Sequence, residues 1–97
     1  MTIWKFELEL RQSQVVEMPA DARILDVQVQ GGALYLWALV DPRRDREERR
    51  VEIVGTGTPA GHVLGEQLDY VATVQVESFV WHVFASGSPR WANGGSV

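Results

Sequence analysis

Residues 24–40 read ILDVQVQGGALYLWALV, and this stretch decides the fold class. Its first part alternates apolar and polar residues, which is the period of a β-strand with one buried face. Gly31 and Gly32 follow, and glycine tolerates the positive φ angles of a two-residue hairpin turn. Residues 33–40 return as a strand that is apolar on both faces, so we expect it to be central and covered on both sides. In strand 24–30 the alternation predicts that the inward residues are Leu25, Val27 and Val29, and the outward ones Asp26, Gln28 and Gln30.

The same period of two recurs on both sides of this hairpin. Residues 3–10 form one such strand, and Pro19 closes another at residues 15–18 because proline cannot donate to a sheet. The first strand is predicted to share one face among Trp4, Phe6, Leu8 and Leu10. Further strands are expected at residues 50–55, 70–76 and 79–85, with Tyr70, Ala72, Val74 and Val76 on one side of the second and Phe79, Trp81 and Val83 on one side of the third. Seven short strands with little helix predict an all-β fold, a compact antiparallel sandwich or barrel.

The composition of the 97-residue chain limits its architecture and its chemistry. The length allows one domain, which we place at residues 1–85, followed by a flexible Gly/Ser-rich tail at residues 86–97. The chain has no cysteine, which excludes disulfides and thiolate metal sites, and its two histidines leave little for metal or general-base chemistry. We therefore expect no metal and no cofactor.

No targeting or membrane segment is visible in the sequence. The longest apolar run, residues 33–40, is far shorter than the roughly 20 residues of a membrane-spanning helix. The net charge is −4, which also argues against a nucleic acid polymer as partner. We expect a soluble cytoplasmic protein that does not bind membranes.

Residues 43–50, RRDREERR, are the first candidate site, because five of these residues are arginine. Guanidinium groups bind phosphate and carboxylate through two parallel hydrogen bonds. Acidic residues are interleaved with the arginines, and Asp41 precedes them. The alternative is therefore a solvated loop or one short helical turn whose charges compensate one another.

Residues 55–61, GTGTPAG, are a second candidate, because glycine lets a backbone approach a phosphate. The segment lacks the lysine of a phosphate-binding loop and Pro59 interrupts it, so a connection between strands explains it equally well. His62 and His82 have no carboxylate or nucleophile at a catalytic spacing. An enzyme is not expected, and an unrecognised hydrolase is the third reading.

Aromatic residues exceed what the core of so small a sheet protein needs. Trp37 shares one face of its strand with Tyr35, while His82 and Phe84 lie opposite Trp81 on theirs. Aromatic surface outside the core marks an interface or a ligand pocket. We therefore expect self-association into a homo-oligomer.

Five segments carry a resemblance to a known family: TIWKFEL at 2–8, ILDVQVQ at 24–30, LWALVD at 36–41, GTG at 55–57 with Pro59, and FVWHVF at 79–84. Over residues 2–85 the chain resembles small uncharacterised proteins of tailed phages and bacterial prophages. The resemblance implies a phage or prophage origin and an infected bacterial host, and it carries no activity. By analogy of genome context, small phage proteins include inhibitors of bacterial defence, some of which sequester nucleotide signals.

These observations lead to one function hypothesis and one alternative. The hypothesis is a non-catalytic binding protein that captures a small anionic, nucleotide-like host defence signal, with arginines on its phosphate and a tryptophan stacked on its base. The alternative is a protein–protein interaction module, either a phage assembly component or an inhibitor that docks on a host protein. The predicted ligand-binding residues are Arg43, Arg44, Arg46, Trp37, Trp81 and His82.

Overall fold

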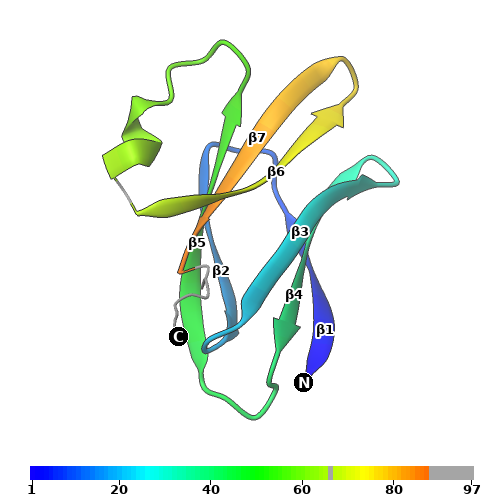
Figure 1. Ribbon diagram of the computed structural model, residues 1–97. Coiled ribbons are helices and arrows are strands. Elements are labelled where there is room, and N and C mark those ends of the chain that lie inside the picture. Colours follow the sequence, from blue (N-terminus) through cyan, green and yellow to red (C-terminus); the bar gives the residue numbers. More distant parts are fainter. Residues whose placement is uncertain (66, 88–97) are drawn as a thin grey trace.

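The computed structural model describes residues 1–65 and 67–87 (Figure 1). This part of the chain forms seven strands and one short 3₁₀ helix, which confirms the all-β prediction. The elements are β1 (Thr2–Leu8), β2 (Ser13–Pro19), β3 (Arg23–Gln30), β4 (Ala33–Val40), β5 (Arg46–Gly55), η1 (Gly61–Gly65), β6 (Leu68–Val76) and β7 (Phe79–Ser86). Residues 88–97 of the expected tail lie outside the described residues.

The strands form two antiparallel sheets that pack against each other (Figure 1). One sheet has the order β1-β4-β3 and the other has the order β2-β5-β7-β6. Two hairpins, β3–β4 and β6–β7, pair neighbouring strands, whereas β1 pairs with β4 and β2 pairs with β5. β5 and β6 both run antiparallel to β7, so the connection that contains η1 returns along the length of the sheet. Across the sandwich, β3 contacts β6.

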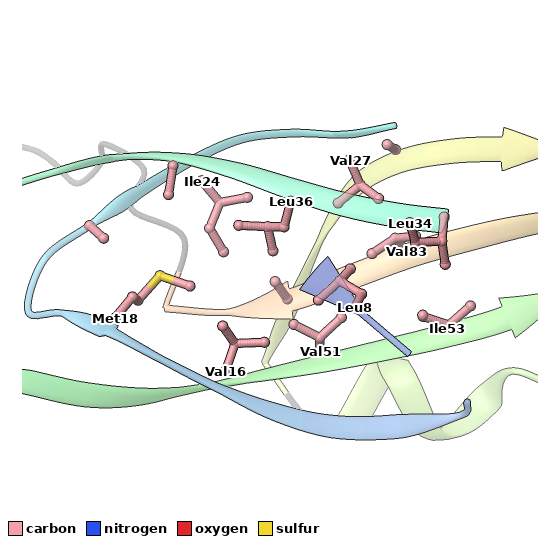
Figure 2. Packing of buried hydrophobic residues seen from close by; sticks show 14 of the residues in the cluster. Leu8, Val16, Met18, Ile24, Val27, Leu34, Leu36, Val51, Ile53 and Val83 are labelled. Atoms are coloured by element: carbon pink, nitrogen blue, oxygen red, sulfur yellow. The ribbon is translucent and has the colours of Figure 1, made fainter. Parts of the chain in front are cut away.

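The core lies between the two sheets and is built from aliphatic side chains (Figure 2). Each strand contributes alternate residues, and β4 alone contributes four that are at most 3% exposed. Full burial of one such side chain contributes about 1.5–3 kcal/mol. Trp4 and Phe6 of β1 are partly buried and pack against this cluster. The most deeply buried aliphatic residues include Met18, Val27, Leu36, Val40, Val51 and Val83.

Gly31 and Gly32 form the turn of the β3–β4 hairpin, as predicted. Their φ angles are +61° and +84°, which non-glycine residues rarely adopt. A Cβ atom at either position would meet no atom within 4 Å, so the backbone conformation and not a lack of space favours glycine. This turn sets the register in which Gln30 pairs with Ala33.

Two β-bulges correct the predicted inward and outward pattern. In β3 the register shifts between Ile24 and Asp26, and Leu25, which we predicted to be buried, is 44% exposed. In β6 the register shifts between Tyr70 and Ala72, and Tyr70 is 59% exposed. A bulge adds one residue to a strand of period two and therefore reverses the face of the residues on one side of it.

Strand ends explain two further corrections. Leu10 lies two residues beyond the end of β1, and Phe79 is the first residue of β7; they are 47% and 64% exposed. The charged run also differs from the expected loop or helical turn, because β5 already begins at Arg46, opposite Pro19 of β2. Pairing with β2 gives residues 46–50 the backbone partners that a helical turn would otherwise supply.

β4 is the central strand of its sheet, as predicted, but residues 1–65 and 67–87 cover it on one side only. Its inner residues are buried, whereas Tyr35, Trp37 and Leu39 on the outer side are only partly buried. In the described part of the chain, the segments packed on this sheet meet its inner face and the edge at β3. The sequence pattern predicts a layer on each side of β4, and the described residues supply one of the two layers.

Candidate functional site

The first three predicted arginines are already engaged by neighbouring side chains. Arg43 donates to both carboxylate oxygens of Asp41, over 3.0 and 3.1 Å. These side-chain hydrogen bonds lower the pKa of the Asp41 carboxyl from 3.8 to about 2. Arg44 donates to Asp21 over 2.6 Å, and the guanidinium of Arg46 lies 5.1 Å from the ring centre of Trp4. An anion binding here would have to displace the two carboxylates.

The last two arginines of the run have structural partners. The side chain of Arg49 is 2% exposed, and it donates to the carbonyl oxygens of Ser86 and Ala22 over 2.7 and 2.8 Å. Burial lowers the pKa of this guanidinium. Arg49 therefore ties together the end of β7, the start of β3 and the middle of β5, which are far apart in the sequence. Arg50 donates to Glu52 over 3.0 Å.

The structure does not bring the other predicted residues together with the arginines into one site. Trp37 lies on the outer side of the β1-β4-β3 sheet, where its ring is 6.2 Å from that of Tyr35. Trp81 lies on β7 in the other sheet and packs against the inner cluster. His82 is the next residue of β7 and so faces the opposite side of that sheet from Trp81.

His82 is held between two hydroxyl groups. Its Nε2 atom is 2.7 Å from Thr56 Oγ1, and its Nδ1 atom is 3.0 Å from Thr73 Oγ1. The hydroxyl of Tyr70 continues this chain, 2.8 Å from Thr73 Oγ1. Both imidazole nitrogens are thus occupied by hydroxyls that can donate or accept, which is the pattern of a satisfied packing histidine.

Glu52 is the centre of a buried polar cluster on β5 that the sequence did not reveal. Its side chain is 1% exposed and accepts hydrogen bonds from Ser13 Oγ at 2.5 Å and from Arg50. His62 Nε2 of η1 lies 3.5 Å from its other carboxylate oxygen. In a hydrolytic triad the histidine lies between serine and carboxylate, whereas here the carboxylate lies between serine and histidine. The cluster therefore anchors η1 and β2 to β5.

A small pocket opens beside Trp81, at the end of the sandwich where β5 ends and β7 begins. Its volume is about 220 Å³, below the roughly 300–1,000 Å³ of most ligand sites. Trp81 packs tightly on Gly55, since a Cβ at position 55 would lie 3.0 Å from its ring. Among the residues that the structure describes, the buried indole N–H of Trp81 has no hydrogen-bond partner. The walls are mostly apolar, and the polar side chains that reach the pocket include Gln12, Thr58 and His62.

A group of apolar side chains lies on the outer side of the β1-β4-β3 sheet. We call this surface the Trp37 face and define it as Ile3, Leu25, Tyr35, Trp37 and Leu39. Ile3 and Leu25 are 56% and 44% exposed. The ammonium group of Lys5 lies 4.5 Å from the ring centre of Tyr35, which confirms that both side chains are on this side. Contiguous apolar surface of this kind marks an interaction site.

Two members of the Trp37 face were missed by the sequence analysis. Ile3 precedes the inward Trp4, so strand alternation already places it outside, and an apolar residue at such a position was an available signal. Leu25 reaches this side only through the bulge in β3, and no residue of the segment indicates that bulge in advance.

Among residues 1–65 and 67–87, no cluster of three or more His, Cys, Asp or Glu side chains could hold a metal ion. A helix long and apolar enough to cross a membrane is likewise missing from this part of the chain.

A family model described as a domain of unknown function, DUF7352, matches residues 1–93. The chain belongs to this family. The match spans every strand of the DUF7352 domain and extends past Ala85, the end of the resemblance described above. No curated protein and no solved structure matches the chain. Because the family description carries no activity, the function of this DUF7352 domain has to be argued from its own residues.

Proposed function

We propose that this protein is a non-catalytic interaction module that binds another protein chain through the Trp37 face. The observation that carries the proposal is the open outer side of β4, where Tyr35, Trp37 and Leu39 are only partly covered. A central strand that is apolar on both sides normally lies between two layers. A partner chain on the Trp37 face would supply the second layer.

The distribution of charge supports a protein partner over a small anion. Arg43 and Arg44 are each paired with a carboxylate, so they offer no free cationic fork. The Trp37 face has an apolar centre, and Lys5, Glu7 and Asp26 lie around it in the same sheet. An apolar, aromatic centre with a charged rim is the usual composition of a protein interface.

Photo-crosslinking in the cells from which the gene comes tests this proposal. The full chain carries p-benzoylphenylalanine in place of Trp37 or, as the matched control, in place of Gln75. Gln75 is exposed on β6, in the other sheet. We expect a protein adduct from position 37 and none from position 75. No adduct at position 37, or equal adducts at both positions, would contradict the proposal.

Capture of a small anionic, nucleotide-like ligand is the second candidate, and the pocket beside Trp81 favours it. Trp81 offers an aromatic surface there, and the pocket volume of about 220 Å³ suits a single planar ring. In this version the gene is of phage or prophage origin, and the protein holds a defence signal in the cytoplasm of the infected bacterium. Arg43, Arg44 and Arg46 lie before or at the start of β5, whereas this pocket lies at its end, so the phosphate of a nucleotide bound here would face Arg11, which lines the pocket.

Native mass spectrometry with cyclic and linear nucleotides tests the second candidate. It predicts a stoichiometric complex from which the nucleotide is recovered intact after denaturation. Trp81→Leu should abolish the complex, whereas replacing Arg43, Arg44 and Arg46 together by glutamine, at the other end of β5, should leave it intact. A nucleotide that is recovered hydrolysed would instead favour an enzyme. If no complex forms, the second candidate is contradicted and the interaction module is the proposal that remains.

A further inference from the structure

We infer that the partner on the Trp37 face is a second copy of this chain, related by a two-fold axis that runs along β4. This inference rests on the proposed function and names its partner. The geometry that points to it is the cross-strand register, which places charged and apolar residues in rows across the three strands.

The rows across the sheet are fixed by the pairing of β4 with both neighbours. Lys5 of β1 and Asp26 of β3 lie opposite Trp37 on its two sides. In the next row toward the start of β1, Ile3 and Arg23 lie opposite Leu39 on its two sides. Leu25, the extra residue of the bulge, lies between these two rows on the β3 side. The row through Trp37 therefore carries a cation on one flank, an anion on the other and an aromatic residue between them.

A two-fold axis along β4 lays each β1 flank against the partner's β3 flank at the same height. Trp37 then meets the partner's Trp37 on the axis, and Lys5 lies opposite the partner's Asp26. By the same operation Ile3 lies opposite the partner's Arg23, with the partner's Leu25 beside it. The two symmetry-related pairs of Lys5 with Asp26 are attractive, and the tryptophans of the two copies meet each other.

The other in-plane axis, perpendicular to β4 through Trp37, gives the opposite result. It would place Lys5 against the partner's Lys5 and Asp26 against the partner's Asp26. Like charges across an interface are a strong penalty against a wrong arrangement. Of these two arrangements, the charges in the Trp37 row favour the one with the axis along β4.

The contacts that Lys5 and Asp26 make within one chain permit this exchange. Lys5 donates to Gln30 over 3.2 Å, and both side chains are exposed. Replacement of this solvent-exposed hydrogen bond by an ion pair costs little. Asp26 accepts from its neighbour Val27 N and from Gln28, each on a different carboxylate oxygen. A carboxylate has further lone pairs for a cation.

The size of the face sets the expected affinity. Three strands about 4.8 Å apart and roughly eight residues long make a surface of about 15 by 27 Å. This is smaller than the roughly 800 Å² per partner of a standard stable interface. We therefore expect a dimer with a dissociation constant in the micromolar range, one that forms and separates with concentration.

Sedimentation velocity of the full chain from about 1 to 300 µM tests the dimer. The expected result is a reversible monomer–dimer equilibrium. Lys5→Glu should raise the dissociation constant at least tenfold, Lys5→Arg should leave it within about threefold, and Glu17→Lys on exposed β2 should not change it. Lys5→Glu combined with Asp26→Lys should restore dimerisation. If Asp26→Lys does not fold, the comparison of Lys5→Glu with Lys5→Arg still tests whether the positive charge of Lys5 stabilises the dimer.

The outcomes separate this inference from the proposed function. A monomer at 300 µM that still gives an adduct with another protein at position 37 overturns the dimer and leaves the interaction module. A monomer without an adduct overturns both. A dimer that tolerates Lys5→Glu overturns the assigned face.

Discussion

Arginines at neighbouring positions of one charged run have different surroundings. Arg43 forms a bidentate pair with Asp41 at the surface, whereas Arg49 is buried and donates to two carbonyl oxygens. The first arrangement could be predicted from the sequence, because the two residues are two positions apart and carry opposite charges. The second could not, because the carbonyl groups of Ala22 and Ser86 reach Arg49 only through the tertiary fold. Arginine is rarely fully buried, so the residue type alone predicts a solvent-exposed side chain at position 49.

Arg49→Met tests the structural role of the buried arginine. Methionine fills much of the same space but leaves the carbonyls of Ala22 and Ser86 without their donor, and hydrogen bonds to charged groups contribute about 1.5–3 kcal/mol each. We expect the free energy of unfolding in urea to fall by about 2–4 kcal/mol. Arg44→Met removes an exposed ion pair and should change it by less than about 1 kcal/mol. Equal effects of the two variants would show that Arg49 contributes only packing.

The pair formed by Asp41 and Arg43 predicts a measurable titration. Because the pKa of Asp41 in the folded protein is about 2, below its usual 3.8, the charged carboxylate stabilises the folded state at higher pH. That contribution is lost as the pH falls from about 4 to about 2. In a carbon-detected NMR titration, Arg43→Gln should move the Asp41 pKa back toward 3.8, whereas Arg44→Gln should leave it in place. An unchanged pKa in Arg43→Gln would contradict the assignment of its cause.

At the scale of single elements, the sequence indicated where strands lie better than which face each residue takes. The limits of β4 matched residue for residue, because its apolar run is bounded by two glycines and by Asp41-Pro42. The predicted faces were wrong for Leu25 and Tyr70, since each lies at a bulge that adds one residue to a period of two. The start of β5 failed as well, because the strand pairing of Arg46 depends on β2 and its charge resembles that of a loop.

The candidate sites followed the same division. The aromatic excess on β4 was visible in the sequence, and the Trp37 face is where the structure leaves it. The predicted grouping of Trp37, Trp81 and His82 with arginines required knowledge of sheet order, which local periodicity does not contain. Residues on opposite sides of two different sheets have no local pattern in common.

The hairpin between β3 and β4 gives a prediction for a single element. Gly31 has a φ of +61° with open space around it, a conformation that asparagine tolerates and valine does not. We expect Gly31→Asn to keep or slightly raise the melting temperature, because asparagine restricts the unfolded chain more than glycine does. Gly31→Val should lower the free energy of unfolding by about 1–2 kcal/mol. Similar melting curves for both variants would mean that the turn relaxes to another conformation.

At the scale of the whole molecule, two sheets form one core, and the smaller sheet keeps an open apolar side. A folded state that dimerises gains stability with concentration by mass action. Between about 5 and 500 µM we expect the melting temperature of the full chain to rise by about 4 °C or more. The Trp37→Ser variant should melt at a lower temperature that does not depend on concentration. A melting temperature of the unmodified chain that stays constant over this range would argue against the dimer.

The pairing of β1 with β4 and of β2 with β5 has a consequence while the chain is being made. A ribosome releases β1 and β2 first, and each must wait until its partner strand has emerged. Until then neither has a backbone partner, and Trp4 and Phe6 have no core to join. The two strands of the β3–β4 hairpin leave the ribosome one directly after the other. This hairpin is thus the first element with which β1 of a nascent chain can pair. Pauses in translation just before residue 33 would lengthen the time in which chaperones or other nascent chains can bind these apolar side chains.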